Sequence, residues 1–194
     1  MPVTYTNRKG ITYYLCKRVT KTGKPRYYFA RQVKGEPVEE IPKGWKIGES
    51  VNGLVFLSKD HPAQILPKEV ATVEAAVGRH PKSRNYRVSV KHDRIEIHEQ
   101  VGPNAENLTA VLEQQGLGMP GLDDRIRAER ERSARFTPVL RFILTDAKRR
   151  IFRVERMHYG GRNEWFELRL KGSVNRLARR LIPKLGTHAF FELF

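Results

Sequence analysis

The first 35 residues of the chain contain nine lysines or arginines and no aspartate or glutamate. Two runs rich in tyrosine, phenylalanine and isoleucine, at residues 11–15 and 26–31, flank a turn of threonine, lysine, glycine and proline. This pattern predicts a β-hairpin. A folded hairpin with so much uncompensated positive charge repels itself unless an anion binds to it. The feature therefore favours a polyanion-binding sheet at the start of the chain.

The charge of the whole chain has the same sign, with a formal net charge of +16 over 194 residues. It is concentrated at the two ends, with +9 over residues 1–35 and +8 over residues 136–194. Such a surplus favours nucleic acid as a partner, then an acidic protein, then an anionic membrane surface. Either the two basic ends share one face or the chain has two anion-binding regions.

The single cysteine, Cys16, excludes a disulfide framework within the chain and a multi-cysteine zinc site. No stretch of about 18 apolar residues is present, and Arg8 and Lys9 interrupt any apolar signal core. We therefore expect a cytoplasmic protein with no membrane partner. The sequence leaves the oligomeric state open.

We expect an α+β protein of three parts. Residues 1–60 are predicted to form a small N-terminal antiparallel β-domain of four strands, in which Asn52 and Gly53 mark a hairpin turn. Residues 61–121 form a middle αβ segment that ends in a Gly/Pro linker at 116–121. Residues 122–194 begin with a charged helix and continue into a β-meander and a C-terminal helix.

The middle segment is predicted to be a helix–hairpin–helix unit. Pro67 suits the first turn of a helix over residues 68–78, and Gly78 suits its end. Apolar and polar residues then alternate on both sides of a two-residue turn at 92–93, which predicts a hairpin with one apolar face. The spacing of leucine and valine predicts a second helix over residues 104–115.

The last sixty residues are predicted to form a three-stranded antiparallel meander closed by a basic amphipathic helix. Apolar residues alternate with polar ones in the segments 140–145, 152–155 and 166–171, which predicts three strands with one buried face. Ser173 can cap the helix that follows. Apolar residues line one side of that helix and basic residues the other.

Lysine and arginine neutralise phosphates, and aromatic faces stack on unpaired bases. The first hairpin offers both residue types in alternation, although the period of two assigns about half of its aromatic residues to a core face. In general shape it resembles the small basic sheets with which tyrosine recombinases bind arm-type DNA sites. The candidate nucleic-acid-binding residues are Arg8, Lys9, Tyr14, Lys17, Arg18, Lys21, Lys24, Arg26, Tyr28 and Arg31 in the hairpin region and Arg176, Arg179, Arg180 and Lys184 in the C-terminal helix.

Motifs for catalysis are sparse. The chain contains neither a Gly-rich phosphate loop followed by Lys-Ser/Thr nor a Gly-x-Ser-x-Gly elbow, and its six histidines form no His-x-x-x-His pair. We therefore expect no cofactor, no metal site and no catalytic residues. The function that we expect is nucleic-acid binding without catalysis, with DNA or RNA and single or double strands left open.

Two alternatives remain. The first is an adaptor that docks an acidic protein partner through one basic end. The second is a metal-dependent nuclease, because residues 153–158 have the Arg-x4-His spacing of HEPN ribonucleases and residues 10–11 with 27–28 resemble the opening hairpin of GIY-YIG nucleases. Residues 167–171 resemble the Glu-x-Lys pattern of restriction-type nucleases. In all three cases, apolar and polar residues alternate as in a strand, which favours solvent-facing strand residues over a nuclease site.

Overall fold

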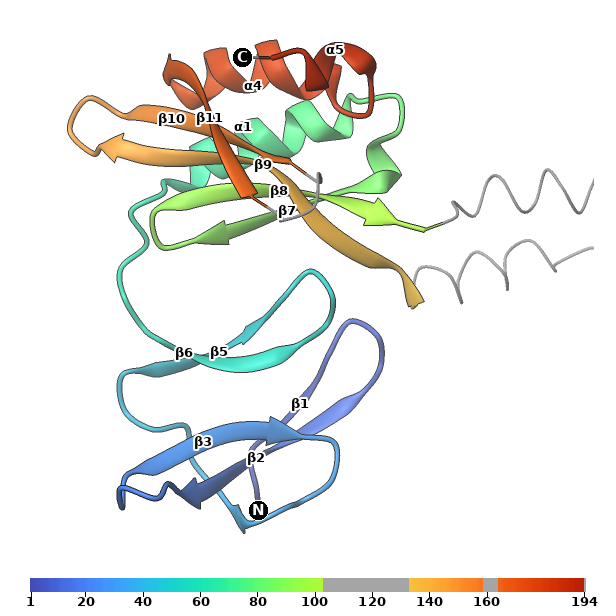
Figure 1. Ribbon diagram of the computed structural model, residues 1–194. Helices are drawn as coiled ribbons and strands as arrows, with labels where there is room; N and C mark the ends of the chain where they lie inside the picture. Colours follow the sequence, from blue (N-terminus) through green and yellow to red (C-terminus); the bar gives the residue numbers. More distant parts are fainter. Residues whose placement is uncertain (103–132, 159–163, 194) are drawn as a thin grey trace, which may run out of the picture. The chain divides into compact units, whose positions relative to one another are not determined.

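The computed structural model describes residues 1–102, 133–158 and 164–193. Strands make up 46% and helices 20% of this part of the chain, with three sheets and few, short helices. The expected α+β fold class is therefore wrong, and the fold is mostly β. The chain divides into two compact units, one over Met1–His61 and one formed by residues 62–102 and 134–193 (Figure 1).

The first unit is built around strand β2 (Thr12–Val19). Strand β3 (Pro25–Ala30) pairs with one edge of β2, and the short strands β1 (Thr4–Thr6) and β4 (Glu36–Pro37) share the other edge. Leu15, in the middle of β2, is fully buried. The hairpin expected around residues 20–25 is present, and β1 and β4 extend it into a four-stranded sheet.

A second, two-stranded sheet of the same unit consists of β5 (Trp45–Glu49) and β6 (Val55–Lys59). Gly53 adopts a φ of +78° in the turn between them, which favours glycine. The side-chain amide of Asn7 donates a hydrogen bond to the Gly53 carbonyl at 2.7 Å. Instead of the four strands expected in this region, six strands form two sheets, because short edge strands carry little hydrophobic alternation.

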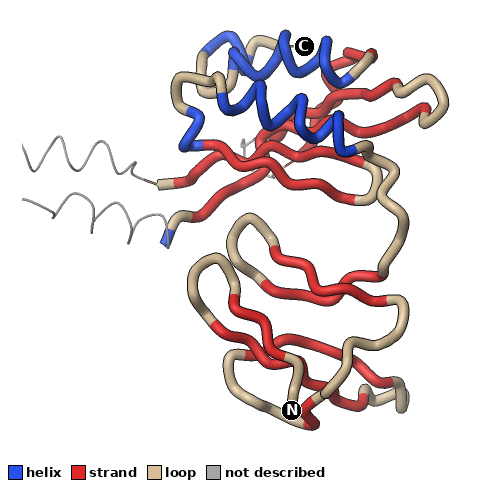
Figure 2. Tube along the Cα trace, turned by 180° about the vertical axis from the view of Figure 1, so that it is seen from behind, coloured by secondary structure: helices blue, strands red, loops and turns tan. Residues whose placement is uncertain are grey.

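The second unit contains a five-stranded antiparallel sheet in the order β11-β10-β9-β8-β7, so that each strand lies beside its neighbour in sequence. Two helices, α1 (Pro67–Gly78) and α4 (Val174–Leu181), lie side by side on one face of this sheet (Figure 2). The strands are β7 (Tyr86–Lys91), β8 (Arg94–Val101), β9 (Arg135–Asp146), β10 (Ile151–His158) and β11 (Glu164–Gly172).

The middle hairpin and the C-terminal meander are thus parts of one sheet. Strand β8 pairs with β9 from Arg94 opposite Ile143 to Val101 opposite Arg135. This pairing satisfies the backbone groups that a free β8 edge would expose, and it joins the apolar faces of both segments. Of the expected helix–hairpin–helix unit, only α1 and the hairpin lie in the described residues. The expected helix at 104–115, the linker at 116–121 and most of the charged helix lie outside them.

The core of the second unit lies between the sheet and its two helices. Phe142 and Phe152 of the sheet are fully buried, as are Val73 of α1 and Ala178 and Leu181 of α4. After α4 the chain continues through the 3₁₀ helix η2 (Ile182–Lys184) and the short helix α5 (His188–Phe191). Another 3₁₀ helix, η1 (Ser83–Asn85), precedes β7. Ser173 does precede α4, but its side chain makes no capping hydrogen bond.

A row of polar residues, one from each strand, crosses the five-stranded sheet. Each member stands directly opposite the next in the strand register, and Glu96 and Glu155 are only 2% and 5% exposed. Buried carboxylates need partners, because an isolated charge away from water is very costly. The row consists of Ser89, Glu96, Arg141, Glu155 and Glu167.

Arginines supply those partners. Arg141 and Arg153 both form ion pairs with Glu155, and Arg153 also reaches Glu167 at 3.0 Å. The guanidinium of Arg141 lies 3.9 Å from the centre of the Trp165 ring, which is a cation–π contact. Ion pairs between neighbouring strands, Arg141 with Glu155 and Arg153 with Glu167, therefore support the register at this end of the row.

Candidate nucleic-acid interface

The β2–β3 hairpin presents a basic and aromatic face. Arg18 and Arg26 are direct neighbours across the ladder, and Tyr28 lies one position further along the same face. The guanidinium of Arg18 lies 5.7 Å from the centre of the Tyr28 ring. The Tyr28 hydroxyl donates a hydrogen bond to the Lys34 carbonyl, which holds the ring in place. Tyr28 therefore supports the position of Arg18.

Four cations gather at the turn end of this hairpin, and we call Arg18, Lys21, Lys24 and Arg26 the basic turn cluster. All four are exposed, and none forms an ion pair with another described residue. Like charges placed directly opposite each other in a ladder destabilise it, so the pairing of Arg18 with Arg26 costs free energy in the unbound protein. An anion between them would remove that cost.

The turn itself is well ordered by hydrogen bonds. The Thr20 hydroxyl accepts a hydrogen bond from the Lys24 backbone N–H at 3.1 Å, and the Gly23 N–H donates to the Thr20 carbonyl at 2.9 Å. Gly23 has a φ of +75°, a conformation that suits glycine. The cluster is therefore displayed on a defined turn.

Two of the expected binding residues are neutralised within the unit. Lys17 lies 3.3 Å from a carboxylate oxygen of Glu36, and the Nε of Arg8 lies 2.8 Å from Glu49. Tyr5 also donates a hydrogen bond to Glu49 at 3.0 Å. Burial opposes ionisation of Glu49, but the hydrogen bonds from Arg8 and Tyr5 outweigh it and lower the pKa of this carboxyl. Arg8 and Lys17 thus have structural partners.

The remaining hairpin residues occupy different places. Tyr14 is half-buried on the same face as Arg18, and Arg31 is exposed just after β3. The stem of Lys9 lies beside Gly53, so this residue contributes to the contact with the β5–β6 turn. The structure therefore gathers only part of the expected set at the turn.

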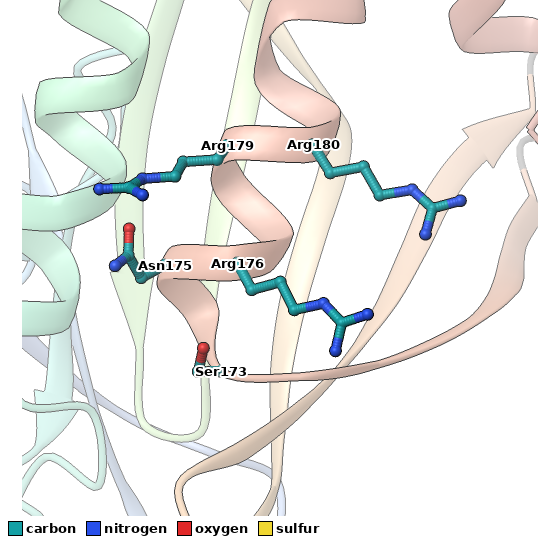
Figure 3. A pocket seen from close by; sticks show the side chains of 5 residues that line it. All are labelled: Ser173, Asn175, Arg176, Arg179 and Arg180. Atoms are coloured by element: carbon teal, nitrogen blue, oxygen red, sulfur yellow. The ribbon is translucent and has the colours of Figure 1, made fainter.

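Helix α4 forms a second basic surface. Arg176, Arg179 and Arg180 are exposed and line a pocket of about 480 Å³ together with Ser173 and Asn175. Figure 3 shows Arg176 and Arg180 pointing to one side of the helix, while Arg179 points to the other side, toward α1. All five lining residues have polar side chains, and the charged ones among them are arginines.

The sequence of α4 leaves this charge uncompensated. The helix contains no acidic residue, and Arg176 and Arg180 lie four positions apart, where like charges repel. Arg176 also lies in the first turn, at the positive end of the helix dipole. An anion near the start of α4 would be stabilised by both effects. The fourth expected residue, Lys184, lies in η2 and is partly buried.

The structure places the nuclease-like segments in strands and turns. Residues 153–158 lie in β10, where Arg153 is paired with Glu155 and Glu167, and residues 10–11 lie between β1 and β2. Within the described part of the chain, no group of three or more His, Cys, Asp or Glu side chains could hold a metal ion. None of the helices in this part is both long and apolar enough to cross a membrane.

One basic residue beside helix α4 was not among the candidates identified from the sequence. Arg79 follows α1 directly and lines a pocket together with Arg179 of α4. Its position after the expected helix end was visible in the sequence, but its neighbour was not. Only the packing of two helices separated by about a hundred residues brings the two arginines to one site.

Comparisons with known proteins found no matching family model, curated protein or solved structure. Any inference about function therefore rests on the fold and on the two basic surfaces.

Proposed function

We propose that this protein binds nucleic acid, without catalysis, through phosphate contacts of the basic turn cluster and of helix α4. The observation that carries the proposal is the pair Arg18 and Arg26, which face each other across the ladder with no carboxylate partner among the described residues. A phosphate between the two guanidiniums turns a repulsive pair into two charge-assisted contacts. Binding and relief of repulsion then reinforce each other.

A polymer of phosphates fits these surfaces better than a single small anion. The basic turn cluster offers four exposed cations, and α4 offers three more arginines on a separate unit. Each phosphate neutralised by lysine or arginine releases a counterion from the nucleic acid, which supplies affinity and makes it salt-dependent. The net charge of +16 adds long-range attraction.

Fluorescence anisotropy with short labelled single- and double-stranded DNA and RNA tests the proposal. We expect the double variant Arg18→Glu/Arg26→Glu to bind the preferred ligand at least about tenfold more weakly than the wild type, since each lost charge-assisted contact is worth roughly 1.5–3 kcal/mol. The matched control is Lys148→Glu/Arg149→Glu, which removes the same charge from the exposed β9–β10 turn. Equal losses in both variants would show attraction by net charge alone.

The same titration separates the proposal from an adaptor function. If none of the four ligands binds at low salt, the proposal is wrong. The basic surfaces would then serve to dock an acidic protein partner, which should copurify with the chain after nuclease treatment.

A further inference from the structure

A hollow of about 300 Å³ lies between α1 and α4 in the second unit. Its floor is apolar because two alanines, Ala76 and Ala178, stand where the helices approach each other. This volume is at the lower end of the range for small-molecule sites. The lining residues are Ala76, Arg79, His80, Pro81, Ala178, Arg179 and Pro183.

Two guanidinium groups from different helices border the hollow. Arg79 is the C-cap residue of α1, and Arg179 extends from α4 toward α1 (Figure 3). Both are exposed, and neither is paired with a carboxylate in the described residues. The hollow is therefore apolar at its floor and positively charged at its border.

His80 forms a fixed wall of the hollow. The Lys82 backbone N–H donates a hydrogen bond to its Nδ1 at 3.1 Å, which leaves Nε2 as the donor to the Leu185 carbonyl at 3.2 Å. The Tyr86 ring packs edge-on against the imidazole, with 4.9 Å between the ring centres. Both ring nitrogens are engaged, so Arg79 and Arg179 are the side chains with charge to offer a ligand.

We propose that this hollow binds a phosphomonoester dianion, held by Arg79 and Arg179. A guanidinium presents a planar fork of donors that matches phosphate oxygens, and two of them balance a dianion. The apolar floor at Ala76 and Ala178 would lie against carbon atoms of the group esterified to the phosphate. The proposal shares Arg179 with the proposed function but goes beyond it, because contacts to internal phosphodiesters do not require a terminal phosphate.

Isothermal titration of the full chain with adenosine 5′-monophosphate and with adenosine tests the site. We expect the monophosphate to bind at least about tenfold more tightly than the nucleoside, and we expect Arg79→Gln and Arg179→Gln each to weaken it about tenfold, the loss for one charge-assisted contact. Both arginines are exposed, so the substitutions leave the core unchanged, and urea unfolding verifies this.

The matched control is Arg149→Gln in the β9–β10 turn, which lies near the first turn of α1. The neighbouring Arg150 binds Glu69 in the first turn of α1, whereas Arg79 follows the last turn, and 12 residues of helix span about 18 Å. Monophosphate binding no tighter than that of adenosine, or an equal loss in Arg149→Gln, would overturn the proposal.

One further titration distinguishes the end of a nucleic acid from a free nucleotide as the source of the phosphate. Tighter binding of a 5′-phosphorylated oligonucleotide than of its 5′-hydroxyl counterpart identifies the end of a nucleic acid. Equal affinity for both oligonucleotides, with monophosphate binding retained, identifies a free nucleotide. The hairpin variant Arg18→Glu/Arg26→Glu should keep its affinity for the monophosphate, so that failure of the proposed function is distinguished from failure of this site.

Discussion

Arg18 of β2 and Arg26 of β3 stand directly opposite each other in the first sheet, with the Arg18 guanidinium 5.7 Å from the centre of the Tyr28 ring. A ladder usually places opposite charges or apolar residues at such positions, because like charges there are destabilising. The repulsion weakens the unbound hairpin, and the same pair attracts a phosphate. Stability and affinity are therefore linked through one cross-strand pair.

The substitution Arg26→Glu should raise stability and lower affinity at the same time. It places a carboxylate opposite Arg18 and keeps the contact between Arg18 and Tyr28, so we expect the free energy of unfolding to rise by about 0.5 kcal/mol. Urea unfolding at low salt measures this gain, and high salt should reduce it by screening. Lys21→Glu serves as the control, because Lys21 lies in the turn outside the β2–β3 ladder, and its gain should be clearly smaller than that of Arg26→Glu. A fall in stability for Arg26→Glu would contradict the prediction.

The substitution Glu155→Gln should destabilise the second unit. It leaves the charges of Arg141 and Arg153 without their shared partner, and we expect a loss of about 2 kcal/mol, less than for a fully buried pair because both arginines are partly exposed. Urea unfolding gives the value. Glu167→Gln, at the more exposed end of the same row, should cost less than about 1 kcal/mol. Equal costs would show that burial of Glu155 does not matter.

Acid should weaken the second unit through Glu96. Burial opposes its ionisation, but hydrogen bonds from His98, Lys91 and Arg94 outweigh burial and lower the pKa of Glu96 from 4.5 to about 2. Because the folded pKa lies below the unfolded one, the stabilisation is complete above about pH 4.5 and is lost as the pH falls toward 2. This contribution is up to about 3 kcal/mol.

Urea unfolding of the wild type and of Glu96→Gln at pH 6 and pH 2.5 measures this contribution. The variant should lose less stability between the two pH values than the wild type. The exposed Glu74→Gln should lose as much as the wild type. Identical pH dependence in all three proteins would contradict the assignment to Glu96.

Gly53 and Gly44 offer a matched test of the contact between Asn7 and the β5–β6 turn. Both have a positive φ, +78° and +79°, so alanine is strained at either position. A Cβ at Gly53 would lie 2.9 Å from the Asn7 amide nitrogen, whereas nothing lies within 4 Å at Gly44. We expect Gly53→Ala to cost at least about 2 kcal/mol and Gly44→Ala about 1 kcal/mol in thermal or urea unfolding. Equal costs would mean that the close approach to Asn7 relaxes freely.

Local features of the fold could be predicted from the sequence. Asn52 and Gly53 mark the observed turn between β5 and β6, and Pro67 and Gly78 bound α1. The turn at 92–93 joins β7 and β8 as the alternation indicated. These predictions succeed because turn residues and hydrophobic periodicity act within a few residues of each other.

The fold class could not be predicted, because it depends on which strand edges meet. The pairing of β8 with β9 joins Val101 to Arg135 across residues that carry no strand signal of their own. The ion pairs could not be predicted for the same reason. Arg8 and Glu49 are 41 residues apart, and neither charge has a sequence pattern that identifies the other. The basic hairpin was visible, but which of its cations remain unpaired was not.

The salt dependence of nucleic-acid binding tests the central proposal most directly. We would measure the Kd of the preferred ligand between about 50 and 200 mM salt, for the wild type and for Arg18→Glu/Arg26→Glu. Six to ten phosphate contacts predict a loss of roughly 10³- to 10⁵-fold in affinity over this range for the wild type, and a flatter slope for the variant. A slope near zero in the wild type, or the same slope in both proteins, would contradict phosphate binding by this hairpin.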